Sequence, residues 1–401
     1  MRVSRIVVAI LVATMLWTAG AMTANGAAKR PTRAKAAKPK TATAKSEQTP
    51  ARVKPAYPDG EMRAVFCLLP KSDNREEGMR EIEANLRQWR SGGINTLLLF
   101  VTSRYLAALD DPELQKTEPK AAWDAVGEMI RAAKKQKLQV HALYAPWLRK
   151  DKARAVELEQ HPEWTAIDGK GKVAEKGVLC FVRPEVRQFE LDQIAKIMDR
   201  YPDLVGIQLE EPGYRWRTNC CYCDTCRAFC QQNFGIDIQK NRVAAKPTVQ
   251  NLAAFMCTDF VIRLRKMMLD KRPDMWLSAN GGFDDSEWYL GRDWHTWARR
   301  GLIDFYMPQV YCDNVKLFTD RTSMTKTSLD GRCDLIPAIG LTWQAIAPKK
   351  QPPTLIKAEI EVTRNLGTKG FSIFPAKEME EVHYQAVREA VNEKPDSATT
   401  P

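Results

Sequence analysis

The sequence predicts an α/β protein with a single (β/α)8 TIM-barrel domain, and three observations lead to that fold. Eight short runs between residues 62 and 391 are apolar at consecutive positions, which is typical of strands buried on both faces of a parallel sheet. Helical stretches separate the runs, as expected for alternating βα units. The competing fold, an open doubly wound sheet, would normally carry a glycine-rich phosphate turn after an early strand, and none is present.

The first half of the predicted barrel contains four strands and four helices. The strands are RAVFCLLP (63–70), INTLLLFV (94–101), LQVHALYA (138–145) and LVGIQLEE (204–211). The helices are expected over residues 75–93, 121–137, 152–161 and 184–201. An irregular segment over residues 162–177 separates the last two helices, so the third βα unit is expected to carry a long excursion.

The second half repeats the alternation. Its predicted strands are MWLSAN (275–280), LIDFYMPQVY (302–311), DLIPAIGL (334–341) and GFSIFPA (370–376). Its predicted helices cover residues 248–271, 294–301, 314–325 and 354–367. Pro273 marks the end of the long helix over 248–271, because proline cannot continue the hydrogen-bond ladder.

The segments before and after the barrel have different compositions. Arg2 and Arg5 precede an apolar run over residues 6–17 and then small residues, which predicts a signal peptide over 1–28 and a secreted or periplasmic protein. The apolar run is short for a membrane span, so an uncleaved membrane anchor is the alternative. Residues 29–60 are rich in Lys, Ala and Pro and predict a disordered linker. The barrel follows over 61–391, and 392–401 form a disordered tail.

The positive charge is concentrated before the barrel. The formal net charge is +12, and residues 29–54 alone carry nine basic side chains against one acid. When this stretch and the two arginines near the start are set aside, the rest of the chain has a net charge of only about +2. A nucleic-acid partner is therefore not expected, since it needs a basic patch on the folded surface. The linker suggests association with an anionic envelope instead.

Acidic and aromatic side chains follow most of the predicted strands. The carboxyl ends of barrel strands form the face on which TIM-barrel active sites lie. Aromatic rings can stack on sugars, and carboxylates supply the acid, base or nucleophile of glycoside cleavage. The expected substrate-binding residues are Arg104, His141, Tyr144, Trp147, Tyr214, Trp216, Gln309, Tyr311 and Trp343. Aromatic rings can also simply cap a barrel core, and His141 can be a packed strand residue.

Several stretches together resemble one family. The runs INTLLLFV, VHALYAPW, HPEW, PEVRQFELDQIAKIMDRYPDLVGIQLEE, DWHTWARRGLIDFYMPQVY and GFSIFPA are similar in order and spacing to the glycosyl-hydrolase-like family 10 barrels of the α-amylase-like group. The resemblance covers about residues 62–390. It implies a TIM barrel, glycoside hydrolysis and an acid at the end of the fourth strand, which falls on Glu210.

The carboxylates of the predicted site can be ordered by strand geometry. Side chains alternate along a strand, so Gln208 and Glu210 share the inner face and Glu211 starts the following loop. Because its side chain faces the barrel mouth, Glu210 is the expected nucleophile or base. The two-carboxylate route also needs a second acid. The candidates for its partner are Glu211, Asp284, Asp285 and Asp313. Glu211 can equally be a cap or a salt-bridge residue, and the run IPAIGLTW ends without a carboxylate, unlike true family 10 xylanases.

Five of the ten cysteines occur together between residues 220 and 230. Four of them, Cys220, Cys223, Cys226 and Cys230, read CxxCxxCxxxC. This spacing fits disulfides that staple the loop, a structural zinc site or an iron–sulfur cluster. The last would usually end in proline, but Gln231 follows. The reaction requires no cofactor, so zinc would be purely structural.

Together these observations predict an exported glycoside hydrolase that cleaves a polysaccharide or oligosaccharide by a carboxylate mechanism at the C-terminal face of the barrel. The alternative is a TIM barrel that binds glycans without cleaving them. A second carboxylate within about 5–10 Å of Glu210 would favour the enzyme.

Overall fold

The computed structural model describes residues 55–147, 156–174, 177–214, 221–342 and 350–392. The expected signal peptide, most of the linker and nearly all of the tail lie outside these residues. The described part begins at residue 55, within the predicted linker. Tyr57 stacks on Trp276 with 4.9 Å between ring centroids and donates a 2.8 Å hydrogen bond to Asp334. The linker boundary is therefore corrected, because Tyr57 packs against the sheet.

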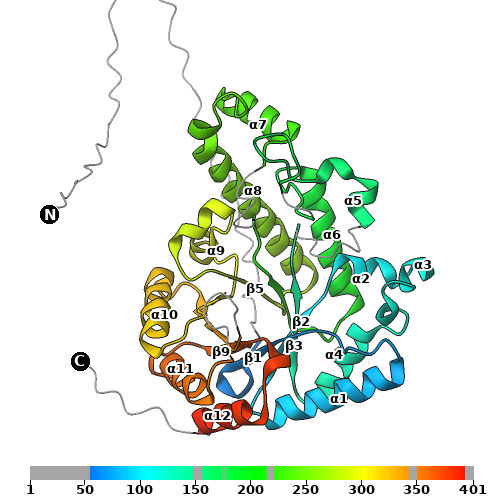
Figure 1. Ribbon diagram of the computed structural model, residues 1–401, viewed down its shortest axis with the longest axis vertical. Helices are drawn as coiled ribbons and strands as arrows, with labels where there is room; N and C mark the ends of the chain where they lie inside the picture. The colour runs from blue at the N-terminus through cyan, green and yellow to red at the C-terminus, as the bar shows by residue number, and fades with distance from the viewer. Residues whose placement is uncertain (1–54, 148–155, 175–176, 215–220, 343–349, 393–401) are drawn as a thin grey trace, which may run out of the picture. The chain divides into compact units, whose positions relative to one another are not determined.

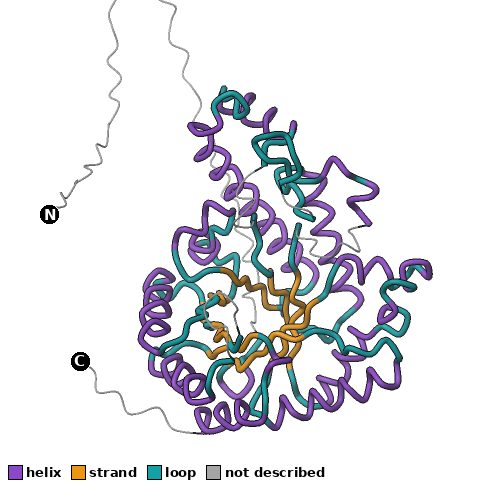
Figure 2. The backbone as a smooth tube through the Cα atoms, in the orientation of Figure 1, coloured by secondary structure: helices purple, strands orange, loops and turns teal. Residues whose placement is uncertain are grey.

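In the described residues, the core of the fold is one curled sheet of nine parallel strands. In sequence order the strands are β1 (Met62–Cys67), β2 (Thr96–Phe100), β3 (Gln139–Tyr144), β4 (Gly206–Leu209), β5 (Trp276–Gly281), β6 (Phe305–Pro308), β7 (Asp334–Leu335), β8 (Ala338–Gly340) and β9 (Gly370–Phe374). Their order in the sheet is β7-β6-β5-β4-β3-β2-β1-β9-β8. The parallel sheet predicted from the apolar runs is thus present, and Figure 2 shows its strands surrounded by helices.

Beyond the ladder itself, the two edges of the sheet approach each other. Gln309, just after β6, forms an isolated parallel bridge with Ala338 of β8, and Val310 donates a 3.1 Å backbone hydrogen bond to the same residue. Strands β7 and β8 are separated only by Ile336 and Pro337. The predicted seventh strand, DLIPAIGL, is therefore interrupted at its proline, which has no backbone N–H for a ladder.

Helices follow the strands and cover the outside of the sheet (Figure 1). The α-helices are α1 (Arg75–Ser91), α2 (Ser103–Ala108), α3 (Pro112–Gln115), α4 (Ala125–Lys135), α5 (Val156–Gln160), α6 (Pro184–Arg200), α7 (Asp224–Phe234), α8 (Arg242–Lys271), α9 (Trp294–Arg299), α10 (Val315–Leu329), α11 (Pro353–Asn365) and α12 (Glu381–Asn392). The short 3-10 helices are η1 (Pro58–Gly60), η2 (Pro119–Ala121), η3 (Pro162–Trp164), η4 (Asp285–Leu290) and η5 (Ala376–Glu378). Helix α8 begins earlier than predicted and contains Pro247 near its start.

Alternate residues of each strand enter different cores. The outer core lies between sheet and helices and includes Leu97, Leu99 and Ala142. The inner core includes Met62, Leu98, Leu143, Phe305 and Met307. Because the inner side chains meet across the curled sheet, the residues that follow the strands on this face converge at one rim. The site is built on that rim.

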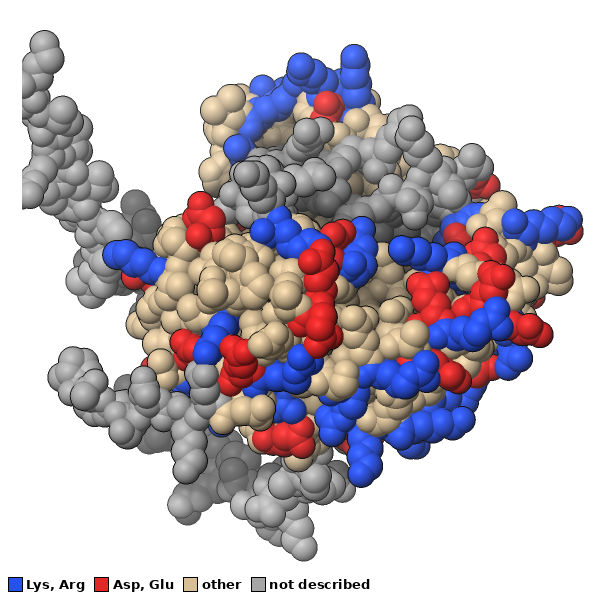
Figure 3. Space-filling model, turned by 60° about the horizontal axis from the view of Figure 1, so that its bottom comes forward, with Lys and Arg blue, Asp and Glu red and all other residues tan. Residues whose placement is uncertain are grey.

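Within the described residues, no helix combines the length and apolarity needed to cross a membrane. On the face drawn in Figure 3, acidic and basic side chains are interspersed over the folded part. This mixture agrees with the small charge left once the basic linker is set apart.

Candidate active site at the carboxyl ends of the strands

Glu210 lies directly after β4 and continues the inner face of the sheet. Its backbone N–H donates a 2.8 Å hydrogen bond to the carbonyl of Tyr144 at the end of β3, so the strand pairing extends to this residue. Gln208, two positions earlier, points to the sulfur of Met307 in the inner core. The alternation predicted from the sequence therefore places the Glu210 carboxylate at the rim.

Asn280 of β5 fixes the two adjacent glutamates. Its Nδ2 donates a 2.5 Å hydrogen bond to Oε2 of Glu210, and its Oδ1 accepts a 2.8 Å hydrogen bond from the backbone N–H of Glu211. The amide of Asn280 thus donates through its nitrogen and accepts through its oxygen, which holds it in a single orientation. Asn280 is the last residue of the predicted strand MWLSAN, and no role was predicted for it.

Glu211 has a backbone φ of 42°, in the left-handed region that costs energy for a residue with a Cβ atom. This conformation ends the regular alternation, so Glu211 does not simply occupy the face opposite Glu210. Its Oε1 accepts a 3.1 Å hydrogen bond from Gln309, and Oε2 lies 3.6 Å from a guanidinium nitrogen of Arg292. The salt-bridge role that the sequence left open for Glu211 is present.

Behind Glu211 lies a buried ion pair. Arg292 pairs with Glu287 at 2.9 Å, and both side chains are about 4% exposed. Glu287 also accepts a 2.6 Å hydrogen bond from the N–H of Gly282, and Arg292 donates to the carbonyl of Tyr214 at 3.2 Å. Burial raises the pKa of Glu287, and the charge of Arg292 opposes that rise. This pair supports Glu211 from below and connects the loops after β4 and β5.

Tyr311 completes the described part of the rim. Its side chain is buried and stacks on Phe374 with 5.7 Å between ring centroids. Burial raises its pKa well above the usual value, and the charges of Glu210 and Glu211 raise it further. The phenol is therefore protonated at neutral pH and lies near both carboxylates. Of the expected substrate-binding residues, Gln309 and Tyr311 are the two that the structure brings to these acids.

The other three expected acids occupy different positions. Asp284 is half-buried in the loop after β5. Burial and the charge of Glu287 raise the pKa of Tyr306, and the charge of Asp284 adds a smaller rise. Asp285 begins η4; its side chain is outside the described part. Asp313 is exposed and accepts a 2.9 Å hydrogen bond from Asn314, the residue before α10. The geometry therefore favours Glu211 over Asp313 as the neighbour of Glu210.

Three expected aromatic contacts are buried in packing. Tyr144 faces the helices and donates a 2.5 Å hydrogen bond to Glu190 of α6. Trp147 donates its backbone N–H to Glu190 at 2.6 Å and its indole N–H to Gly213 at 3.1 Å. Tyr214 packs on Phe181 with 4.3 Å between ring centroids. All three side chains are at most 1% exposed, which corrects their expected role: they hold loops and offer no open ring face to a sugar.

His141 and Arg104 also lie away from the acids. His141 is fully buried, and neither ring nitrogen has a hydrogen-bond partner among the described residues. Burial lowers its pKa to about 3, so the imidazole is neutral. His141, on β3, lies at a level two inner-face positions below Glu210, roughly 13 Å along the strand direction. Arg104 forms an ion pair with Glu118 at 2.9 Å and a hydrogen bond with Thr117. Trp216 and Trp343 lie outside the described residues.

The cysteine grouping differs from the predicted one. The sulfur atoms of Cys180, Cys221, Cys223 and Cys226 all lie within 4.8 Å of one another. Cys230 is buried elsewhere on α7, one turn and about 6 Å beyond Cys226 along the helix axis. Cys220 lies outside the described residues, so the expected set of Cys220, Cys223, Cys226 and Cys230 is corrected in its membership. Every described cysteine is a free thiol.

Sequence reasoning missed four residues that shape these clusters. Asn280 shares the inner face of β5 with Ser278 and Trp276, so strand alternation offered a signal for it. Glu287 and Arg292 lie in and just after η4, where no periodic pattern exists. Cys180 comes from a segment far upstream of the other thiols, and only the fold brings it to them.

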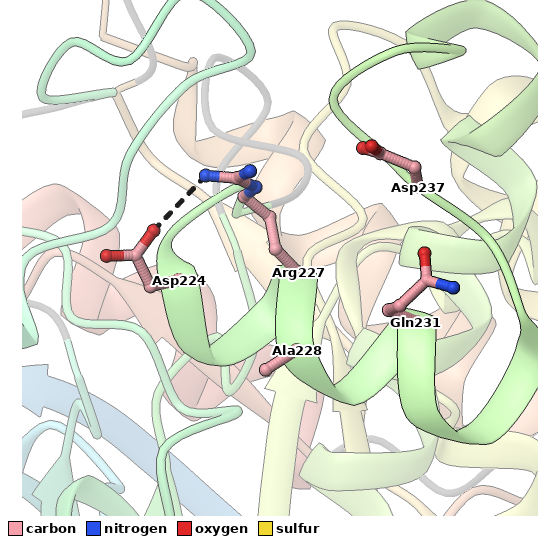
Figure 4. Close-up of a pocket in the computed structure, with 5 residues that line it drawn as sticks. All are labelled: Asp224, Arg227, Ala228, Gln231 and Asp237. Carbon is pink, nitrogen blue, oxygen red and sulfur yellow. Dashed lines mark hydrogen bonds and ion pairs between the residues drawn. The ribbon is translucent and has the colours of Figure 1, made fainter.

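Two surface depressions lie outside the rim of acids. One is formed on the outer side of α7 by Asp224, Arg227, Ala228, Gln231 and Asp237 (Figure 4). Its Asp224 and Arg227 form an ion pair at 3.3 Å. The other lies among α8, η4 and α9 and includes Trp288, which is 38% exposed. Trp288 therefore presents aromatic surface to solvent, but in a depression outside the rim of acids.

Comparisons with known proteins agree with this fold. The family model described as Glycosyl hydrolase-like 10 matches residues 94–337. Among curated proteins, none matches the chain. Solved structures with a similar fold include an α-L-fucosidase isoenzyme 2 from Paenibacillus thiaminolyticus, with a TM-score of 0.59 and 16% identity over 82% of this chain and 48% of that one. The catalytic domain of β-amylase from Paenibacillus polymyxa has a TM-score of 0.57 and 10% identity over 84% of this chain and 99% of that one.

A third similar structure is a catalytic mutant of Gan42B, a GH42 β-galactosidase from G. stearothermophilus. Its TM-score is 0.58, with 12% identity over 83% of this chain and 56% of that one. The chain thus spans about half the length of the fucosidase and of the galactosidase. At these identities the likeness establishes a glycosidase-like TIM-barrel fold and nothing about substrate.

Proposed function

The chain belongs to the glycosyl hydrolase-like 10 family, and on that premise we propose that it hydrolyses glycosidic bonds, with Glu210 as the nucleophile or base. The observation that carries the proposal is the pair of carboxylates after β4. Glu210 is oriented by Asn280 at 2.5 Å, and Glu211 is held beside it by Gln309 and Arg292. Glycoside cleavage in most families uses two carboxylates that flank the scissile bond.

Each residue of the pair has a proposed task. Glu210 attacks the anomeric carbon or activates the attacking water. Glu211 is its partner acid, turned toward the same rim by its left-handed backbone. Tyr311, protonated and close to both carboxylates, is a hydrogen-bond donor to a carboxylate or to a sugar hydroxyl. The substrate is a polysaccharide or oligosaccharide.

The barrel architecture supports this placement. We propose that β7 and β8 are two halves of one seventh strand, broken at Pro337, and that the Gln309–Ala338 bridge closes a (β/α)8 barrel. In a barrel of this kind the residues after each strand share one face. Glu210, Asn280 and Gln309 would then come from three consecutive strands of that face.

One observation favours a second function. Glu211 is already engaged by Arg292 and Gln309, and an acid held in an ion pair is poorly suited to deliver a proton. A glycan-binding barrel without turnover would need only the polar rim. This alternative predicts binding without release of reducing ends.

Export is proposed separately, from the charged and apolar pattern of residues 1–28. The mature protein would then begin near residue 28, with its basic linker near an anionic envelope. Determining the N-terminal sequence of the protein recovered outside the cytoplasm tests this, and an intact Met1 on that material would count against cleavage.

The test of function is release of reducing sugars from a polysaccharide panel by the purified chain and two variants. Glu210→Gln keeps the size and most hydrogen bonds of the side chain, and turnover should fall by about 1,000-fold or more. Asp313→Asn is the matched control, since Asp313 is exposed and bonded to its neighbour Asn314, and its turnover should stay within about twofold. Equal activity of wild type and Glu210→Gln would remove Glu210 from the mechanism, and binding without cleavage by wild type would favour the glycan-binding barrel.

A further inference from the structure

Four cysteines from two separate segments meet in the interior, behind the loop that follows Glu211. Cys180 follows a bridge between Thr165 and Leu179 and precedes α6. Cys221 and Cys223 precede α7, and Cys226 lies in its first turn. All four side chains are at most 7% exposed. The fold therefore gathers a closed set of thiols that the reaction proposed above does not use.

The spacing of the sulfur atoms matches a metal centre. Cys180 lies 3.5 Å from Cys226 and 3.6 Å from Cys223, and Cys223 lies 3.8 Å from Cys226. A disulfide requires sulfur atoms about 2.05 Å apart. Four thiolates placed tetrahedrally around zinc at about 2.3 Å are separated from one another by about 3.8 Å. An iron–sulfur cluster must also enclose several irons and sulfides, which needs a wider cage.

Hydrogen-bond donors surround the sulfur atoms. The backbone N–H groups of Ile167 and Cys223 point to the sulfur of Cys221 at 3.3 and 3.4 Å. The hydroxyl of Tyr214 lies 3.9 Å from the sulfur of Cys180. Donors aimed at a buried sulfur stabilise the thiolate form, which is the form that binds metal. Three polar groups from different segments thus converge on a set of side chains that would otherwise be weak acceptors.

We propose that Cys180, Cys221, Cys223 and Cys226 bind one structural Zn²⁺ ion. Four sulfur ligands fill the tetrahedral coordination of zinc and leave no open position for water, which distinguishes a structural site from a catalytic one. The ion joins the segment before α6 to the segment before α7. Tyr214, which contacts Cys180, follows Glu211 by three residues, so the site holds residues 211–214 from behind.

Metal analysis of the full chain, purified without chelators, tests the proposal. We expect one zinc ion per chain in the wild type and loss of at least tenfold of the zinc in Cys180→Ser. Cys230→Ser is the matched control: Cys230 is also buried and lies on α7 with Cys226, but it is outside the tetrad, so this variant should keep its zinc. Iron in place of zinc, or a disulfide within the tetrad found by mass spectrometry of the wild type, would overturn the assignment.

A second measurement avoids dependence on a variant that fails to fold. Exchange of the wild-type metal for Co²⁺ should give the intense visible bands of tetrahedral cobalt and the near-ultraviolet charge-transfer bands of cobalt–thiolate bonds. Octahedral, weakly absorbing cobalt, or no uptake by folded protein, would contradict the site. Both readouts measure bound metal and not turnover, so they are independent of the fate of the proposed hydrolase activity.

Discussion

The carboxylates after β4 and the thiol cluster at the start of α7 differ in what surrounds them, although three of the four thiols follow the acids closely in sequence. Glu210 and Glu211 are partly exposed and are held by side chains from later segments of the chain, Asn280, Gln309 and Arg292. The four thiols are closed off from solvent and contact mainly one another. A site that must admit a substrate needs open, oriented charges, whereas a site that holds a loop needs closure. This difference fits the two proposed roles, chemistry for the acids and anchoring for the thiols.

The largest stability effect is expected at the ion pair behind the acids. Arg292→Met leaves Glu287 buried without its partner, which should lower the free energy of unfolding by about 3–5 kcal/mol. The double variant Arg292→Met, Glu287→Met removes the stranded charge as well and should recover at least half of that loss. Urea denaturation of the two variants and the wild type measures the difference. A single variant as stable as wild type would mean that the pair contributes nothing to holding the loops.

The next effect concerns a buried acid that belongs to neither site. Glu359 of α11 is fully buried, its Oε2 has no hydrogen-bond partner among the described residues, and burial raises its pKa to about 9. A carboxyl whose pKa is higher in the folded state binds its proton more tightly there. Its contribution to stability is therefore fully present below pH 4.5 and is lost as pH rises toward 9.

Glu359→Gln should remove this pH dependence. The variant should gain about 3 kcal/mol over the wild type at pH 7 and nothing at pH 4. Glu76→Gln, on the exposed side of α1, is the control and should leave the difference between the two pH values unchanged. Thermal unfolding at a series of pH values measures it. A gain of equal size at both ends would show that packing, and not ionisation, is responsible.

The smallest expected effect is on turnover, and it tests the role of the Asn280 side-chain amide at the rim. Asn280→Ala removes the donor to Glu210 and the acceptor for the N–H of Glu211, so turnover should fall by about 10- to 100-fold. Metal content should be unchanged, because Asn280 contacts the acids and not the thiols. Initial rates of sugar release and zinc analysis on one preparation check both. Full activity in this variant would indicate that the orientation of the glutamates does not depend on the amide.

The positions of the strands and the inward orientation of the Glu210 side chain could be predicted from the sequence, because both follow from local patterns. Consecutive apolar residues mark a buried parallel strand, and alternation then sets which side chain faces inward. The left-handed backbone of Glu211 had no such marker, since nothing in LVGIQLEE distinguishes a regular end from a sharp one. The same alternation, applied to LQVHALYA, would have placed Tyr144 on the helix side with Ala142 and away from the rim.

The remaining parts of the site depend on contacts between distant segments. Arg292 reaches Glu211 because the η4 loop folds back over the strand ends. Cys180 replaces Cys230 in the thiol set because the segment before α6 passes beside the start of α7. Spacing within one stretch, such as CxxCxxCxxxC, cannot report a ligand from another stretch. These are the places where only the three-dimensional structure could correct the prediction.

The central claim is that Glu210 performs chemistry rather than holding the fold or the substrate. The most direct test is the affinity of Glu210→Gln, measured by calorimetry, for the glycan that the wild type cleaves, alongside its turnover. The account predicts a dissociation constant within about fivefold of the wild-type value together with a turnover loss of about 1,000-fold or more. Unchanged turnover with weakened binding would contradict it and would make Glu210 a binding residue.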